Sequence, residues 1–453
     1  MRQSSYKHYL ITVLLVILAF NSVDHWTLGL VAQNLETDLS LSDTQLGFLS
    51  GIAFSVFYAL MGLPLARWAD SGDRVRLIWV TTALWSVAVA LCGAVHNFVQ
   101  LLLVRIVVAV GEAGCMPAAS SLITDYFDRA ERARATSRYM LGGPLSLLVG
   151  YFAAGWLNQY FGWRITFLLT GAPGVALAVL AWLTLKEPRR EKRSALGTLA
   201  PAGGPSHSRM MVANASLREV WVYLFRNKTF RHLLISYSVM AFGGYGMGQW
   251  LPAFFMREYG MGTGELGTWF TGVYGIGSAL GTYWGGELVA RYAARNEPLQ
   301  MKGMAWSYLI SGALSATVYL LVPTEYVAFG LISISVICGA LCNGPLFAAL
   351  QTLAPERMRA QAIAVVLLFT NLIGAGLGPL VVGTLSDIMR SHVGEASLGY
   401  ALFALCPTYV WAAWHLWRAS RTVLRDMAAA EPDARHEPDL ADNGSRRANA
   451  GLT

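Results

Sequence analysis

Apolar runs about as long as a membrane span alternate with short polar segments along most of the chain. A helix needs roughly 20 apolar residues to cross the hydrocarbon of a bilayer. Twelve runs approach that length, and their centres lie near Ile17, Phe57, Ala88, Gly111, Leu147, Val175, Gly243, Gly275, Leu309, Val336, Gly374 and Leu405. The pattern therefore predicts an all-α membrane protein with twelve transmembrane helices.

The longest polar stretch inside the chain separates these runs into two sets of six. It is rich in glycine and proline and carries ten basic residues, as a cytoplasmic linker would. The end of the chain, from about Asp426, lacks apolar periodicity and is predicted to be disordered. The predicted parts are an N-terminal six-helix bundle (1–185), a cytoplasmic linker (186–231), a C-terminal six-helix bundle (232–418) and a disordered cytoplasmic tail (419–453).

Composition and charge support a membrane protein and predict its orientation. The chain is 55% hydrophobic and only 13% charged, which is more apolar surface than a soluble fold can bury. If both termini are cytoplasmic, 30 of the 34 Lys and Arg residues lie inside, whereas Arg164, Arg257 and Arg390 lie outside and Arg105 falls within a span. The positive-inside rule therefore predicts a multi-pass inner-membrane protein with both ends in the cytoplasm. The net charge of +7 gives no reason to expect a nucleic-acid partner.

The cysteines and loops give no sign of a cofactor, a metal or an enzyme site. The five cysteines lie inside apolar runs and are odd in number, so we expect no disulfide framework. Cys338 and Cys342 could share a helix face as metal ligands, but buried thiols are common packing residues, and no histidine or carboxylate lies nearby in the sequence. Nothing matches the phosphate-binding pattern Gly-x4-Gly-Lys-Ser/Thr. We expect no metal and no cofactor.

The two halves resemble each other at corresponding places. Leu46-Gly47 opens the second predicted span and Leu266-Gly267 opens the eighth, while 131–135 after the fourth span has a counterpart in 356–360 after the tenth. Two parallel halves of this kind place a substrate site between them, near the middle of the membrane.

Several motifs carry a resemblance to known transporters. Residues 21–24, 64–76 and 105–113 are similar to motifs of the major facilitator superfamily, and 250–255 and 351–360 resemble the bacterial relatives of the Spinster group. The similarity covers roughly residues 8 to 418. It implies a major facilitator fold and a lysolipid-like or other amphipathic, anionic substrate.

Asp24 is a single carboxylate deep in the first apolar run, followed by His25. Because a carboxylate facing lipid is costly, Asp24 should face a water-accessible interior, where it could take a proton or act only as a structural hydrogen-bonding acid. In Spinster proteins the matching acid is linked to proton coupling and is usually followed by arginine. Here His25 replaces that arginine and adds a group that titrates near neutral pH.

Arg105 and Glu112 are seven residues apart, so they lie on one helix face about 10.5 Å apart along the axis. This spacing leaves Arg105 free to meet Asp24 or an anionic substrate, with Glu112 as a second proton acceptor. The alternative is an ion-pair network that only holds helices together.

A degraded superfamily motif at the cytoplasmic end of the second span keeps Asp70 and Arg74. We expect these residues to act in gating, with Asp70 capping a helix or pairing with Arg357 or Arg359 when the cytoplasmic side closes. Glu287 and Arg291, after the eighth span, would form a second latch. The alternative is that all six are solvated loop charges.

The seventh, tenth and eleventh spans should also line a central cavity, with apolar walls and a few hydrogen-bonding groups. The candidate substrate-binding residues there are Tyr245, Gln249, Trp250, Asn343, Phe347 and Asn371. Aromatic residues near span ends can instead anchor the helix at the membrane surface.

The sequence thus predicts a secondary active transporter, coupled to protons, acting as a monomer on a small-molecule substrate within membrane lipids. One rival is a proton symporter that imports small organic acids, with Arg105 binding a carboxylate. A rival of a different class is a non-transporting receptor or scaffold, in which Asp24, Arg105 and Glu112 could be replaced without loss of activity.

Overall fold

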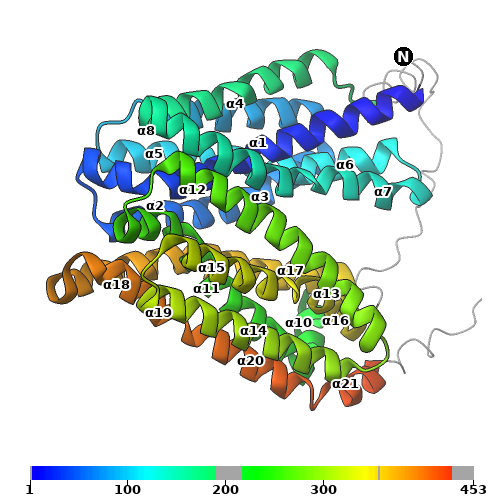
Figure 1. The fold of residues 1–453 in the computed structure, drawn as a ribbon. Helices are drawn as coiled ribbons and strands as arrows, with labels where there is room; N and C mark the ends of the chain where they lie inside the picture. Colours follow the sequence, from blue (N-terminus) through cyan, green and yellow to red (C-terminus); the bar gives the residue numbers. More distant parts are fainter. Residues whose placement is uncertain (1–2, 190–216, 356–357, 431–453) are drawn as a thin grey trace, which may run out of the picture.

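The computed structural model describes residues 3–189, 217–355 and 358–430, and within these ranges the chain forms helices and turns with no strand. Helices α1 to α8 lie together, and α11 to α21 form a second set beside them (Figure 1). We name these sets the N-terminal group (residues 3–189) and the C-terminal group (residues 217–430).

Eight helices run between Gln3 and Thr184 in the N-terminal group. Its longest helix, α8, is broken at Gly162, whose φ of +77° is in the left-handed region that favours glycine. This break divides α8 into the two runs predicted as the fifth and sixth spans. The helices are α1 (Gln3–Leu39), α2 (Asp43–Ser50), α3 (Ile52–Ser71), α4 (Arg74–Cys92), α5 (Phe98–Glu112), α6 (Cys115–Tyr126), α7 (Arg129–Met140) and α8 (Gly142–Thr184).

The described residues of the C-terminal group contain two π-helical segments, η1 and η3, each of which joins two α-helices into a longer run. Its elements are α10 (Leu217–Arg226), α11 (Lys228–Tyr259), α12 (Thr263–Phe270), η1 (Thr271–Gly277), α13 (Ser278–Tyr292), α14 (Glu297–Leu321), α15 (Glu325–Ala340), α16 (Asn343–Leu353), α17 (Arg359–Phe369), η3 (Thr370–Leu377), α18 (Gly378–Val393), η4 (Gly394–Ala396), α19 (Ser397–Leu405), α20 (Pro407–Ala419) and α21 (Val423–Ala430).

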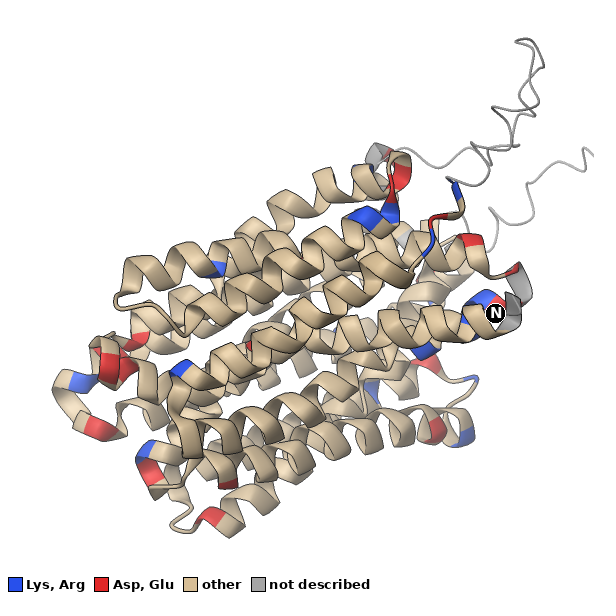
Figure 2. Cartoon of the chain, turned by 90° about the horizontal axis from the view of Figure 1, so that it is seen from above, with Lys and Arg blue, Asp and Glu red and all other residues tan. Residues whose placement is uncertain are grey.

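Eight stretches of the described residues are helical, long and apolar enough to cross a membrane. Two of them, Arg134–Thr184 and Gln361–Ala419, are 51 and 59 residues long, so each has length for two crossings. Most charged residues lie at the two ends of the helices, and few lie in the broad band between them (Figure 2). Large apolar side chains such as Leu183, Leu321 and Tyr283 are at least 66% exposed, as expected for a surface that lipid covers. The prediction of an all-helical, multi-pass membrane protein is confirmed.

The repeated glycines occur where the two groups touch. A Cβ at Gly47 would lie 2.4 Å from the carbonyl oxygen of Pro379, and a Cβ at Gly267 would lie 2.3 Å from that of Tyr151. Each glycine therefore allows the backbone of one group to approach that of the other. The similarity between the halves corresponds to two related contacts, α2 with α18 and α12 with α8.

Parts of the predicted linker and tail are helical. In the linker, α10 stacks Trp221 on Phe225 with ring centroids 4.9 Å apart. In the tail, the Asp426 carboxylate of α21 accepts hydrogen bonds from the backbone N–H and the hydroxyl of Thr229, both at 2.8 Å. The expectation of a wholly disordered tail is therefore wrong for α21, because this contact and the buried Val423 fasten it to the bundle. Residues 190–216 and 431–453 lie outside the described part of the chain.

Candidate functional site

Two acids, one arginine and one histidine meet inside the N-terminal group. Asp24 lies on α1 and is 1% exposed, and Arg105 lies on the facing helix α5 and is also 1% exposed. The Nη1 of Arg105 donates to Oδ2 of Asp24 in a close ion pair. The structure thus realises one of the two contacts that the sequence left open for Arg105.

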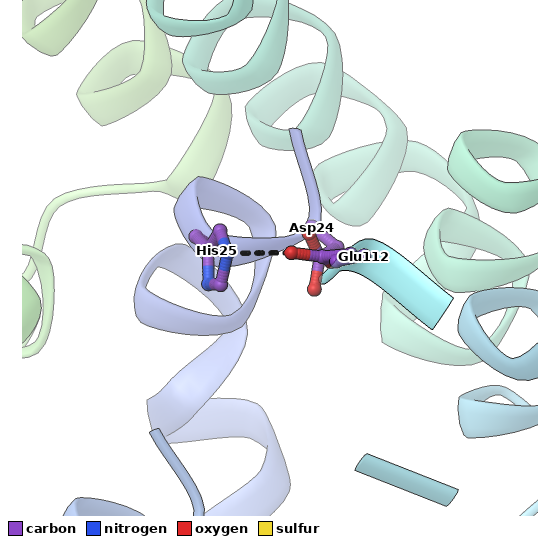
Figure 3. A group of neighbouring side chains, drawn as sticks. All are labelled: Asp24, His25 and Glu112. Atoms are coloured by element: carbon purple, nitrogen blue, oxygen red, sulfur yellow. Dashed lines mark hydrogen bonds and ion pairs between the residues drawn. The ribbon is translucent and has the colours of Figure 1, made fainter. Parts of the chain in front are cut away.

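Glu112, at the end of α5, completes the site, which we call the acid cluster (Asp24, His25, Arg105 and Glu112). Its Oε2 lies 3.2 Å from Nε2 of His25 (Figure 3). The Glu112 side chain is 2% exposed, whereas that of His25 is 33% exposed. His25 is therefore the member of the cluster with the most exposed side chain.

The acid cluster retains unused hydrogen-bonding capacity. Among the described residues, Oδ1 of Asp24, Oε1 of Glu112, and Nε and Nη2 of Arg105 are buried with no protein partner. Unpaired polar atoms are costly in a buried site, so these four atoms call for water, a proton or a polar group of a bound molecule. The side-chain oxygen of Asn21, one turn before Asp24 on α1, is in the same situation.

Phe54 on α3 is a member of this site that the sequence analysis missed. The Arg105 guanidinium lies over its ring at 5.5 Å, and the His25 ring meets it edge-on at 4.6 Å. A phenyl ring attracts a cation over its face, so Phe54 helps to hold both groups in place. One phenylalanine among 19 carries no signal in the sequence that could have identified it.

The positive charge of Arg105 makes the acid cluster a poor site for a metal ion. Ligand atoms of Asp24, His25 and Glu112 lie within 4.8 Å of one another, a spacing that a metal could use. However, Arg105 already occupies one oxygen of Asp24, and its fixed positive charge opposes a second cation there.

Cys338 and Cys342 do not belong to any metal-compatible group of three His, Cys, Asp or Glu side chains in the described residues. The Cys342 thiol donates to the Met304 carbonyl oxygen at 3.6 Å, as a packing residue would.

Arg74, one of the predicted gating residues, forms contacts within the N-terminal group. It is fully buried at the start of α4, where its Nη2 pairs with Glu187 and its Nη1 with Asp125 at 2.8 Å. Arg189 extends this group by donating from Nη1 to the backbone oxygen of Asp70 at 2.6 Å. These contacts join the ends of α3, α4 and α6 to the segment that follows α8.

We expect Arg74→Met to destabilise the protein by about 3 kcal/mol or more, because removing one partner leaves the buried Glu187 carboxylate uncompensated. The melting temperature of the purified protein measures this, and Arg76→Met, at an exposed position two residues away, serves as the control. Equal melting temperatures for the two variants would contradict the prediction.

The same pair predicts a pH dependence. Burial would raise the pKa of Glu187, but hydrogen bonds from the Arg74 side chain and from the backbone N–H groups of Arg189 and Arg74 outweigh it and lower the pKa below 4.5. This stabilisation is therefore complete above pH 4.5 and is lost as the pH falls through the lowered value. In the Arg74→Met variant, this pH-dependent contribution of Glu187 to stability should be lost.

The other predicted gating side chains that the structure describes, Asp70, Glu287 and Arg291, form no ion pair with one another. Asp70 is exposed, as are Glu287 and Arg291 on α13, where the Arg291 guanidinium lies 5.6 Å from the ring of Tyr292. Arg357 and the side chain of Arg359 lie outside the described residues.

The predicted substrate-binding residues of α11 differ in their surroundings. Trp250 is 1% exposed and its indole N–H donates to the Pro379 oxygen at 2.9 Å, so it joins α11 to α18. Gln249 lies against Gly29 of α1: a Cβ added to Gly29 would be 3.2 Å from the backbone oxygen of Gln249. Tyr245 is 46% exposed. Of these three, Tyr245 has the most exposed side chain.

The remaining candidates lie on α16 and η3. Asn343 donates to the hydroxyl of Thr282 at 3.4 Å, and Phe347 meets the ring of Tyr237 edge-on at 5.6 Å. Asn371 is exposed in η3. These three residues belong to the C-terminal group, so a solute touching them and the acid cluster would lie between the two groups.

The family model of the Major Facilitator Superfamily matches residues 14–379. The chain belongs to this superfamily. An MFS-type efflux pump from Mycolicibacterium smegmatis is 30% identical over 393 residues, which is 87% of each protein. A probable L-galactonate transporter from Escherichia coli is 26% identical over 382 residues, covering 82% of this chain and 81% of that protein.

A solved structure supports the resemblance to the Spinster group. A bacterial homolog of the human lysosomal transporter Spinster, in an inward-facing and unoccupied conformation, aligns with a TM-score of 0.81 and 29% identity. The alignment covers 93% of this major facilitator and 98% of the homolog. The fold and the family expected from the motifs are confirmed.

Proposed function

We propose that this major facilitator is a proton-coupled secondary active transporter that moves a small amphipathic or anionic solute by alternating access. The observation that carries the proposal is the acid cluster, in which two buried carboxylates share one arginine and one histidine. Ionisable groups inside a membrane protein are costly and mark ion or substrate pathways. The unpaired polar atoms of the cluster would bind a proton in one step of the transport cycle and a polar group of the substrate in another.

The coupling would work through competition for Arg105. While Arg105 pairs with Asp24, as in this structure, the carboxylate is charged and its charge is compensated. An anionic substrate that draws Arg105 away would leave Asp24 to be neutralised by a proton, because a charged carboxylate without a partner is unfavourable in a buried site. Movement of Arg105 between the two partners would therefore load and release one proton in each cycle.

We further propose twelve spans, with both termini and the linker in the cytoplasm and with bundles at 1–185 and 232–418. The breaks in the helices support this count: Gly162 divides α8, and Cys342 lies between α15 and α16, which together form a single span. A membrane-impermeant thiol reagent should reach a cysteine at position 96 only from outside and one at position 204 only from inside. The reverse pattern would overturn this topology.

The substrate proposal rests on the relatives together with the site. The bacterial Spinster homolog favours a lysolipid-like solute, and the mixture of Tyr245, Phe347 and Asn371 with a buried arginine suits an amphipathic anion. The second candidate is import of small organic acids with protons, which is favoured by the probable L-galactonate transporter among the relatives. In either case Arg105 would bind the acidic group.

A thermal-shift screen of the purified protein tests this proposal. The ligands are a lysophospholipid, a long-chain fatty acid, a sugar acid and a cationic amphiphile, each tested on wild type and on Arg105→Gln. We expect stabilisation by the amphipathic anions in the wild type, since a ligand that binds the folded state raises its stability, and a loss of that shift in Arg105→Gln. Stabilisation by the sugar acid alone would support the organic-acid importer, and stabilisation by the cationic amphiphile alone would overturn both candidates.

A further inference from the structure

The two groups are joined by charged side chains at the end of the molecule where α1 finishes. We propose that these residues form the outer gate of the transporter, which keeps the outside closed in this conformation and has to separate before the substrate site can open outward. We call them the outer cluster: Gln33, Glu36 and Asp43 of the N-terminal group, and Arg257, Asp387 and Arg390 of the C-terminal group. The proposal rests on alternating access and on the orientation proposed above.

Arg257 is the centre of the outer cluster. It projects from α11, is 7% exposed at its side chain, and holds the Asp43 carboxylate with two hydrogen bonds, Nη1 to Oδ2 at 2.9 Å and Nη2 to Oδ1 at 2.7 Å. Its Nη2 also donates to Glu36 at 2.7 Å and its Nε to Gln33 at 2.6 Å. All four of these hydrogen bonds cross from the C-terminal group to the N-terminal group.

Asp387 caps a helix of the opposite group. Its carboxylate accepts hydrogen bonds from the backbone N–H of Asp43 at 3.2 Å, and from the backbone N–H and hydroxyl of Thr44 at 2.8 and 2.6 Å. The first amides of a helix need partners from outside the helix, and a negative charge there is favourable. The start of α2 is therefore stabilised by a residue of α18, and separation of the groups removes that partner.

The contact is also close in shape. A Cβ added to Gly383 of α18 would lie 2.2 Å from the backbone carbonyl oxygen of Asp43. A Cβ added to Gly47 would lie 2.4 Å from the backbone carbonyl oxygen of Pro379. With Asp43 fully buried, the helices meet here without space for an additional side chain. Charge and shape thus act together to close this end.

The outer cluster also connects physically to the acid cluster. Glu36, which pairs with both Arg257 and Arg390, lies twelve residues after Asp24 on the same unbroken helix α1. Twelve residues of α-helix span about 18 Å, so a shift of α1 at the acid cluster moves the outer cluster with it. Charged residues at the end remote from the N-terminus are visible in Figure 2.

The test measures distances between spin labels in the full-length protein, without substrate or pH gradient. Labels at His96→Cys and Thr324→Cys report on the outer end, and labels at Ser71→Cys and Arg295→Cys report on the opposite end; all four positions are exposed. We expect Arg257→Gln to increase the ratio of outward-open to inward-open molecules at least tenfold. Arg164→Gln is the matched control, because it removes an ion pair at the same end, with Asp38, that lies within one group.

Gly47→Val tests the gate by adding side-chain volume rather than by removing a charge. It should likewise increase the ratio of outward-open to inward-open molecules. Unchanged outer distances in folded Arg257→Gln protein, or an equal change in Arg164→Gln, would overturn the proposal. Should Arg257→Gln not fold, Asp387→Ala takes its place under the same criteria. Because the measurement involves no proton or solute, its outcome is independent of the test of proton coupling.

Discussion

Replacing Asp24 with asparagine should abolish uphill transport driven by a pH gradient while preserving the exchange of substrate across the membrane. Asparagine has nearly the shape of a protonated aspartate but cannot release a proton. The variant would therefore remain in the form that we assign to the proton-loaded state, in which Arg105 is free for the substrate. In proteoliposomes, accumulation in response to an imposed pH gradient should fall to the level of protein-free vesicles, whereas counterflow of labelled substrate should persist.

Asp38→Asn is the matched control, because it makes the same substitution on the same helix at a side chain that is 49% exposed and pairs with Arg164. It should retain uphill transport. His25→Ala is the companion variant: it removes the titratable, partly exposed partner of Glu112, and should shift the pH of fastest transport while leaving accumulation possible. An Asp24→Asn protein that still concentrates substrate under an imposed pH gradient would remove Asp24 from the mechanism and leave Glu112 as the candidate.

The sequence contained enough to predict where the acid cluster would form. A lone carboxylate in an apolar run and two charged residues at a helical spacing of seven are costly unless they face one another, so Asp24, Arg105 and Glu112 were expected in one interior. The structure brings Arg105 to Asp24 and His25 to Glu112. The helices themselves followed from the lengths of the apolar runs, because in lipid a backbone has to satisfy its hydrogen bonds within the segment.

The outer cluster could not be predicted in the same way. Arg257 and Asp43 are 214 residues apart, and each lies near a span end, where charged residues are expected in water and need no partner. Only the packing of the two groups brings them into one buried contact. Arg74 shows the complementary case: the motif identified it as important, but the three-dimensional structure pairs it with Glu187 inside one group.

Replacing Arg105 with methionine should have the largest effect of any single change on stability and should also abolish transport. Asp24 is almost completely buried, and removing its partner leaves a carboxylate without compensation, which costs about 3 to 5 kcal/mol for a buried pair. The melting temperature of the purified protein should fall accordingly. Arg105→Lys should recover part of the stability through its charge, but it loses the planar fork that binds carboxylates and packs over Phe54.

The double variant Asp24→Asn with Arg105→Met separates the two roles of this pair. Because it removes both charges, it should melt close to the wild type, although Arg105→Met alone does not. The interaction energy of the pair is the change in unfolding free energy of the double variant minus those of Asp24→Asn and Arg105→Met. Transport should remain absent, since neither a proton carrier at position 24 nor a cation for the substrate is left. Restored stability without restored transport would assign the pair a functional role beyond holding α1 to α5. Restored uphill transport in the double variant would show instead that the pair serves only the packing of the helices.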